Sequence, residues 1–317
     1  MKSRMMIALL GIASLGTLAF AAEPARPGTV NYVEGAAYLD GQPLNNKDVG
    51  STMLQPGQEL YTAAGKAEVL LTPGVFLRVD ANSKVKMISP DLTLTQVELE
   101  KGRAGVEVDE IHDQNNLQVI EAGVTTRIDK NGYYEFDASK PEVMVFKGMA
   151  KTQVADGKWR EIKNHHELML AAEGTRPLAK EKPADFDTNT SDDLYQWSSL
   201  RSQYLAEANN QVAGEYADAG YYPGWYWNPY GWGYTFIGAG PFYSPFGWGF
   251  YPFGWGGGWY GGWGGYYGGR WGHGPYRYGP SHGLARGGVY TGGFHGGAAV
   301  GGFHGSMGGG GFHGGRR

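Results

Sequence analysis

Residues 56–79 read PGQELYTAAGKAEVLLTPGVFLRV, and the fold class follows from this stretch. Apolar residues occupy every second position on both sides of its centre, at Ala67, Val69, Leu71, Val75, Leu77 and Val79. A period of two is typical of strands with one buried face. Residues 72–75 read Thr-Pro-Gly-Val, in which proline presets φ for the second position of a type II turn and glycine supplies the positive φ of the third. The stretch therefore predicts a β-hairpin, with Glu68 and Arg78 pointing away from the core as solubilising residues.

The same pattern extends over residues 28–172. Short alternating runs are separated by turn signals about eight to twelve residues apart, and Asn131-Gly132 is the strongest hairpin signal among them. This spacing favours an all-β domain, an antiparallel sandwich or roll of short strands. About 145 residues are enough to bury a core without disulfides. Periodicity alone leaves the choice between sandwich and roll open.

Several runs in this segment resemble the FecR domain. They are an opening strand that ends at a glycine (28–35), a Gly-x-x-Leu-x-Thr step (56–62), the hairpin itself (65–79) and a Leu-x-x-Gly strand ending (97–104). The resemblance covers roughly residues 28–154 and implies an extracytoplasmic β module that meets a partner or a ligand.

The resemblance has two departures. FecR regulators carry an anti-sigma segment and a membrane-spanning helix before this domain, whereas we expect only a signal peptide here. The family also tends to place Gly-Thr-x-Phe-x-Val after the central strands, and this chain has Gly-Tyr-Tyr-Glu-Phe at 132–136. For these reasons we do not carry the signalling mechanism over whole.

The first residues predict export. Lys2 and Arg4 precede an uncharged and mostly apolar run, which ends in the small-residue pattern Ala19-Phe20-Ala21 of a cleavage site. We predict a signal peptide over residues 1–21, with an uncleaved membrane anchor as the alternative. The chain contains no cysteine, which together with export favours a bacterial periplasmic, secreted or cell-surface protein.

One amphipathic helix is predicted after a linker over residues 173–189. Thr190 is the expected N-cap of a helix over residues 190–213. A mostly apolar stripe recurs at three-four spacing along it, at Leu194, Trp197, Arg201, Tyr204, Leu205, Ala208 and Val212. We expect this stripe to dock on the β domain, with an oligomer contact or a membrane surface as alternatives.

Residues 214–317 read as a disordered, low-complexity tail rich in Gly, Tyr, Trp and His. No acidic residue occurs after Asp218, so a basic tail follows an acidic body and can attract the body, another copy or an anionic surface. Tryptophan rings stack on sugars and on other aromatic rings, which makes the tail a candidate interaction segment. The interaction residues predicted on this ground are Trp225, Trp227, Trp232, Trp248 and Trp255.

Three Gly-Gly-Phe-His-Gly repeats place His295, His304 and His313 nine residues apart. Imidazoles bind Zn²⁺, Cu²⁺ and Ni²⁺, so these residues are the predicted metal ligands, in a weak site because glycine-rich chain encloses no fixed geometry.

No nucleophile–base pair, phosphate loop or dinucleotide fingerprint occurs, so we predict no enzyme activity and no cofactor. The first functional hypothesis is a non-enzymatic envelope binding or scaffolding protein with an adhesive tail. The alternative is a periplasmic regulatory sensor module of a sigma-factor pathway. The expected partner is a cell-wall polymer, a membrane surface or a protein, including further copies of this chain, and not a nucleic acid.

Overall fold

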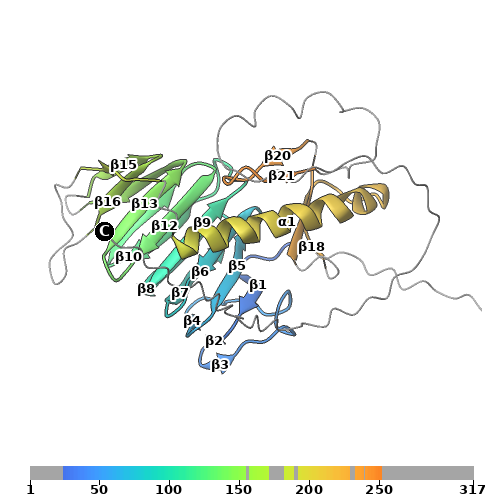
Figure 1. Cartoon of the computed structure of the whole chain (residues 1–317), viewed down its shortest axis with the longest axis horizontal. Helices are drawn as coiled ribbons and strands as arrows, with labels where there is room; N and C mark the ends of the chain where they lie inside the picture. Colours follow the sequence, from blue (N-terminus) through green and yellow to red (C-terminus); the bar gives the residue numbers. More distant parts are fainter. Residues whose placement is uncertain are drawn as a thin grey trace, which may run out of the picture. The chain divides into compact units, whose positions relative to one another are not determined.

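The computed structural model of this chain describes residues 24–154, 157–170, 182–188, 192–228, 233–238 and 240–251. All of these residues belong to one compact unit, Met1–Trp259. Two large β-sheets form its body, and one long helix crosses the strands of the first sheet (Figure 1).

The first sheet has eight strands within the described residues and is called the eight-stranded sheet below. In spatial order its strands are β1 (Thr29–Glu34), β5 (Lys66–Thr72), β6 (Val75–Val79), β9 (Arg103–Val108), β12 (Gly132–Asp137), β13 (Glu142–Lys147), β16 (His166–Met169) and β17 (Ala184–Asp185).

The second sheet has nine strands within the same residues and is called the nine-stranded sheet. Its order is β15 (Trp159–Lys163), β14 (Met149–Gln153), β11 (Val124–Ile128), β10 (Leu117–Glu121), β8 (Leu94–Lys101), β7 (Lys84–Asp91), β4 (Glu59–Thr62), β2 (Ala37–Leu39) and β3 (Gln42–Pro43). Neighbouring strands are antiparallel except β8 and β10, which run parallel.

The hairpin predicted from residues 56–79 is present. β5 and β6 pair antiparallel, with Ala67 opposite Val79 and Val69 opposite Leu77. Gly74 has a φ of +76°, as the third position of a type II turn requires. The pairing shifts between Leu70 and Thr72, so the irregularity lies directly before the turn.

The main hydrophobic core lies between the two sheets. It joins residues such as Val69, Leu77 and Val106 of the eight-stranded sheet to Val97 and Val119 of the nine-stranded sheet. Because one continuous cluster unites alternate residues of both sheets, the body is a two-sheet sandwich. The prediction of an all-β fold is confirmed, and the choice between sandwich and roll is decided by this packing.

Helix α1 (Asp193–Asp218) begins three residues later than predicted and ends five residues later. Asp192 is its N-cap, because the Asp192 carboxylate accepts a hydrogen bond of 2.9 Å from the backbone N–H of Tyr195. The helix docks on the eight-stranded sheet, but the predicted stripe is wrong at Tyr204, whose side chain is 51% exposed. The buried face also includes polar residues that the stripe left out: Ser198, Ser202 and Asn209.

The prediction that residues after 213 form no secondary structure is wrong for much of the described chain between residues 214 and 251. The helix continues to Asp218, and two short hairpins follow, formed by β18 (Gly224–Asn228) with β19 (Gly233–Ile237) and by β20 (Phe242–Tyr243) with β21 (Gly249–Phe250). They form because tertiary packing on α1 and on the eight-stranded sheet buries their aromatic rings, which offsets the entropy cost of ordering glycine-rich chain. Residues 252–317 lie outside the described residues, as do residues 1–21.

A search of the helical segments among the described residues finds none with the length and hydropathy that crossing a bilayer requires.

Candidate functional site

The outer face of the eight-stranded sheet, turned away from the sandwich core, carries a row of charged residues. Strand alternation sends Val69 and Leu77 into the core and places Glu68 and Arg78 on the opposite face, directly across from each other. Glu107 on β9 lies on the same outer face. All three charged side chains have 0% exposure, so the prediction that Glu68 and Arg78 are solvated is wrong. They do point away from the core, but α1 covers them.

Glu68 is bound from both sides of this interface. The guanidinium of Arg78 on β6 donates to Glu68 Oε2 at 2.8 Å, and that of Arg201 on α1 donates to Glu68 Oε1 at 3.1 Å. The amide of Asn31 on β1 donates to the same Oε1 atom. Arg201 also stacks over the ring of Tyr32, with its guanidinium carbon 3.9 Å from the ring centroid. The helix therefore supplies one of the two cations that neutralise this buried carboxylate.

Glu107 is shared between sheet and helix in the same way. Arg78 makes a second ion pair with it through Nη1, and the hydroxyl of Ser202 on α1 donates to Glu107 Oε1 at 2.6 Å. Arg78 is thus held between two carboxylates, and each carboxylate also accepts a hydrogen bond from α1.

The charges of this interface shift the pKa values of its acids in opposite directions. Burial pushes the pKa of Glu68 upward, but Arg201 and Arg78 outweigh it and hold the pKa below its ordinary value of 4.5. Asp109 lies two residues beyond Glu107, and burial together with the Glu107 charge raises the pKa of Asp109 well above its ordinary value of 3.8. Both side-chain oxygens of Asp109 are buried, and a hydrogen bond between the Asp109 and Glu107 side chains favours the protonated form of Asp109. Glu68 is therefore ionised at neutral pH, whereas Asp109 keeps its proton to a higher pH than an exposed aspartate does.

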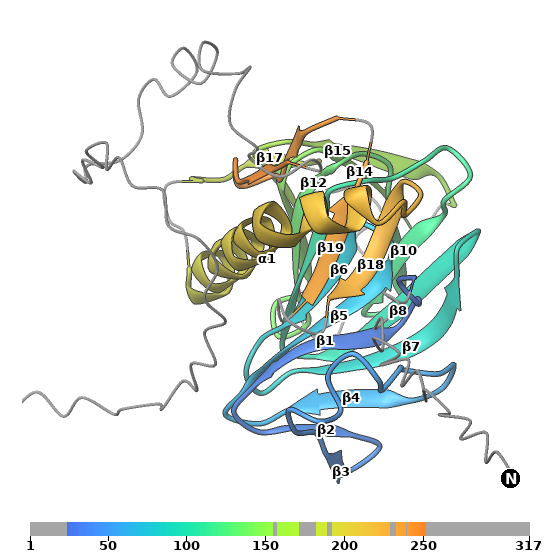
Figure 2. The same cartoon turned by 90° about the vertical axis from the view of Figure 1, so that its right-hand side faces the viewer.

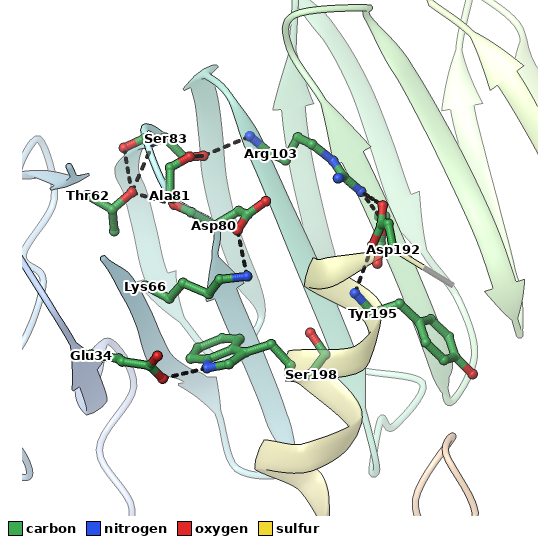
Figure 3. A network of polar contacts seen from close by, with 12 residues as sticks. Glu34, Thr62, Lys66, Asp80, Ala81, Ser83, Arg103, Asp192, Tyr195 and Ser198 are labelled. Atoms are coloured by element: carbon green, nitrogen blue, oxygen red, sulfur yellow. Dashed lines mark hydrogen bonds and ion pairs between the residues drawn. The ribbon is translucent and has the colours of Figure 1, made fainter. Parts of the chain in front are cut away.

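The first turn of α1 is attached to the sheet through its own cap (Figure 3). Arg103 on β9 contacts Asp192 with the same Nη2 nitrogen that donates to Glu135 Oε2 at 2.8 Å. Burial, together with the nearby Asp192 charge, raises the pKa of Glu135 to about 7. One arginine thus joins the N-cap of the helix to an acid of β12.

Further contacts follow along the same side of the helix. The indole N–H of Trp197 donates to Glu34 of β1 at 2.9 Å (Figure 3). The hydroxyl of Tyr133 on β12 donates to Glu135 at 2.8 Å and lies 2.9 Å from the hydroxyl oxygen of Ser198. From its first turn to Ser202, α1 is therefore held by polar contacts in addition to its buried Leu194 and Trp197.

An aromatic cluster covers the adjoining part of the outer face. It contains Leu70 and Phe76 of the sheet and Leu205 of the helix, together with Trp225 and Tyr234 of the β18–β19 hairpin. Figure 2 shows this hairpin beside α1, over the strands β5 and β6. Together, α1 and the two hairpins form a cover over the outer face, and its aromatic cluster is a second, smaller core outside the sandwich.

The predicted interaction tryptophans have internal contacts wherever the structure describes them. Trp225 is 4% exposed and its indole N–H donates to Glu110 at 3.0 Å, which leaves no ring face for an external ligand. Trp227 packs against Tyr234, and the indole N–H of Trp248 donates to Ser199 at 3.3 Å. Trp232 and Trp255 lie outside the described residues. The predicted metal ligands His295, His304 and His313 lie outside them too.

Little in the described part of the chain resembles a catalytic centre. No group of three or more His, Cys, Asp or Glu that could hold a metal ion occurs in the residues that the structure describes. An open groove of about 360 Å³ is lined by Arg160, Glu161, Lys163, His166, Lys182 and Pro183. The side chains of this groove include no serine, cysteine or threonine nucleophile, so the interface under α1 is the better candidate site.

Sequence reasoning missed most of this interface. Glu107, Tyr133 and Glu135 sit in alternating strands, where solvent-facing polar residues are the ordinary expectation. One signal was present, namely Arg201 in the middle of an otherwise apolar stripe. A cation on the docking face of a helix indicates that the surface beneath it is acidic.

Comparison with known proteins addresses the β domain. Two crystal structures of a putative anti-sigma factor from Parabacteroides distasonis, at 2.50 Å and 1.65 Å resolution, are each similar to this chain with 12% sequence identity and a TM-score of 0.34. Each match covers 45% of this chain and 64% of the other, so this chain spans less than two thirds of that protein's length. The curated proteins contain no match to it. Residues 58–179 match the family described as FecR protein, which confirms the resemblance seen in the sequence over this part of the chain.

Proposed function

We propose that this chain is a regulatory protein-binding module of the bacterial envelope, acting as a sensor in a sigma-factor pathway. The observation that carries the proposal is the FecR match over residues 58–179, which contains most of the sandwich and the strands β6, β9 and β12 of its charged outer face. FecR domains belong to regulators that act through contacts with other proteins. The chain works in this role as a receiver of such contacts and not as an enzyme.

The proposed location is outside the cytoplasm. Its support is the sequence pattern of residues 1–21, in which two cations precede an apolar run and a small-residue cleavage pattern. A chain without cysteine folds there without a disulfide step.

A second function, adhesion to wall polymer through the tail, keeps support from composition alone. Residues 252–278 are rich in Trp, Tyr and Gly, and aromatic rings of this kind stack on sugars. The tryptophans Trp225, Trp227 and Trp248 no longer contribute to this support because they pack within the molecule.

A deletion strain separates the two functions. The host lacking the gene is complemented with the full chain or with residues 1–251, and transcripts and binding to purified cell wall are measured. We expect the deletion to change transcript levels from the promoters of one sigma factor. Both the full chain and residues 1–251 should restore those levels. Unchanged transcripts, combined with wall binding that residues 1–251 fail to restore, would favour adhesion and overturn the regulatory proposal. Fractionation of a tagged chain tests the location, and a cytoplasmic pool alone would contradict export.

A further inference from the structure

The interface between α1 and the eight-stranded sheet is unusually polar for a helix that lies on its own domain. Ser198, Arg201 and Ser202 all contact side chains of the sheet and are at most 5% exposed, nearly as buried as the apolar Leu205 of the same helix. Separating an interface of hydrogen bonds and ion pairs costs less free energy than separating an apolar one, because water replaces the partners of the polar groups.

The outer face is incomplete without a helix that carries a cation. The sheet contributes four acids at this face, Glu34, Glu68, Glu107 and Glu135, and three cations, Lys66, Arg78 and Arg103. The face therefore carries more acidic than basic groups, and Arg201 of α1 supplies the missing positive charge. This complementarity defines what binds here: a helix with an arginine beside small hydroxyl residues.

The fit of α1 to this face is not saturated. Arg201 Nε is buried without a hydrogen-bond partner in the described structure. Burial of an unpartnered polar atom costs free energy that is recovered when water reaches it. The resident helix therefore leaves one buried donor unsatisfied, which a ligand with a matching acceptor would satisfy.

We propose that the outer face of the eight-stranded sheet is a binding surface for an amphipathic helix of a partner protein, and that α1 is its displaceable resident. The partner helix carries an arginine at the place of Arg201, with small hydroxyl residues three positions before it and one position after it, as Ser198 and Ser202 stand in α1. While α1 is docked, the face is closed to the partner. The inference rests on the proposed protein-binding function and adds the chemistry of the partner and the means of regulation.

Hydrogen exchange of the full chain tests whether α1 opens by itself. We expect backbone amides of α1 to exchange at least ten-fold faster than those of β5, β6 and β9. Equal protection of helix and strands would mean that α1 leaves the sheet only when the whole domain unfolds, and would overturn the proposal.

Displacement is tested with a fluorescent peptide of residues 192–218 as a stand-in for the partner helix. The full-length variant Arg201→Ala weakens the resident helix, so we expect it to bind the peptide at least ten-fold more tightly than the wild type. A peptide with Arg201→Glu should bind at least ten-fold more weakly to the same variant. Leu200→Ala is the matched control because Leu200 is 44% exposed on the opposite side of α1, and it should bind the peptide as the wild type does.

If Arg201→Ala does not fold, Ser202→Ala replaces it, because it removes one hydroxyl contact to Glu107 and should enhance peptide binding about five-fold. A folded variant that binds neither peptide overturns the proposal. So does a stable dimer of the wild type in which α1 is exchanged between copies, since the occupant is then a second copy. These measurements need no signalling partner, so a failure here with an intact transcript effect removes the displaceable helix and leaves the proposed function standing.

Discussion

The two faces of the eight-stranded sheet are built from the same strands and are both buried, yet they are held by different forces. The inner face presents residues such as Val69, Leu77 and Val106 to an apolar core. The outer face presents Glu68, Arg78 and Glu107 to a helix. Burial of apolar area stabilises the sandwich core. At the interface with α1, the pairing of opposite charges offsets the free-energy cost of burying them.

A pair of acids, one on each side, shows what the difference means. Glu121 on β10 lies in the interior at the other sheet, accepts a hydrogen bond of 3.1 Å from the backbone N–H of Glu142, and has no cation among its recorded partners. Burial raises the pKa of Glu121 to about 9, whereas the two arginines beside Glu68 hold its pKa below the ordinary value. At neutral pH Glu68 is ionised and Glu121 is neutral, because arginines lie beside Glu68 and only burial acts strongly on Glu121.

The largest expected effect is on Arg78. Arg78→Met leaves Glu68 and Glu107 without their shared cation, so we expect a loss of about 3–5 kcal/mol in the free energy of unfolding. Urea unfolding followed by circular dichroism measures it. The control is Leu77→Ala on the inner face, with an expected cost of about 2–5 kcal/mol from the cavity.

Neutralising all three charged residues of the outer face, Glu68, Arg78 and Glu107, tests the same difference between the two faces. A triple variant with Glu68→Gln and Glu107→Gln added to Arg78→Met should recover most of the loss, because no uncompensated charge remains buried. Adding the two Gln substitutions to Leu77→Ala should not restore its stability, because that loss comes from a cavity and not from an unpaired charge. An Arg78→Met variant as stable as the wild type would contradict a charge-based outer face.

The next effect concerns pH and Glu121. Its pKa is raised in the folded state from 4.5 to about 9, so the stabilisation it gives is full below pH 4.5 and is lost as the pH rises through 9. The slope is about 1.4 kcal/mol per pH unit inside this window. Glu121→Gln keeps the acceptor for the Glu142 N–H and should remove the slope, so the variant is more stable than the wild type at pH 7. Parallel stability–pH curves for the two proteins would show that Glu121 is ionised in the fold.

A smaller effect is expected in the aromatic part of the outer cover. Trp225→Phe removes the hydrogen bond to Glu110 and part of the ring that packs on Phe76, 5.7 Å away between centroids. We expect a loss of about 1–2 kcal/mol, since Glu110 is partly exposed and water replaces its donor. Calorimetric unfolding provides the measurement. A loss above that of Arg78→Met would make the aromatic cluster, and not the charge row, the main attachment of the cover.

The smallest effect is expected on the solvent side of α1. Tyr204→Ala removes a ring that is 51% exposed, and we expect a change within about 0.5 kcal/mol in either direction. The same unfolding assay applies. A cost of several kcal/mol would indicate that this ring packs against a part of the chain outside the described residues.

The β body was predictable because its signals are local. The turn at Gly74 needs a positive φ that proline and glycine announce in the sequence, and the alternation of Val69 and Leu77 identifies the inner face. The helix was predictable for the same reason, although its start moved from Thr190 to the cap at Asp192. The hairpins at residues 224–251 were missed because glycine-rich segments take up structure only when another surface buries their aromatic rings.

By itself, the sequence determined which residues alternate, where the chain turns and therefore that the body is an all-β domain. It also determined that Glu68 and Arg78 point away from the sandwich core. Only the tertiary structure decided that these two residues are buried, because α1 reaches them from more than a hundred positions further along the chain, as Arg201 does across a separation of 133. Strand periodicity determines the face of the sheet to which a side chain points, whereas long-range packing determines whether that face is covered by another element.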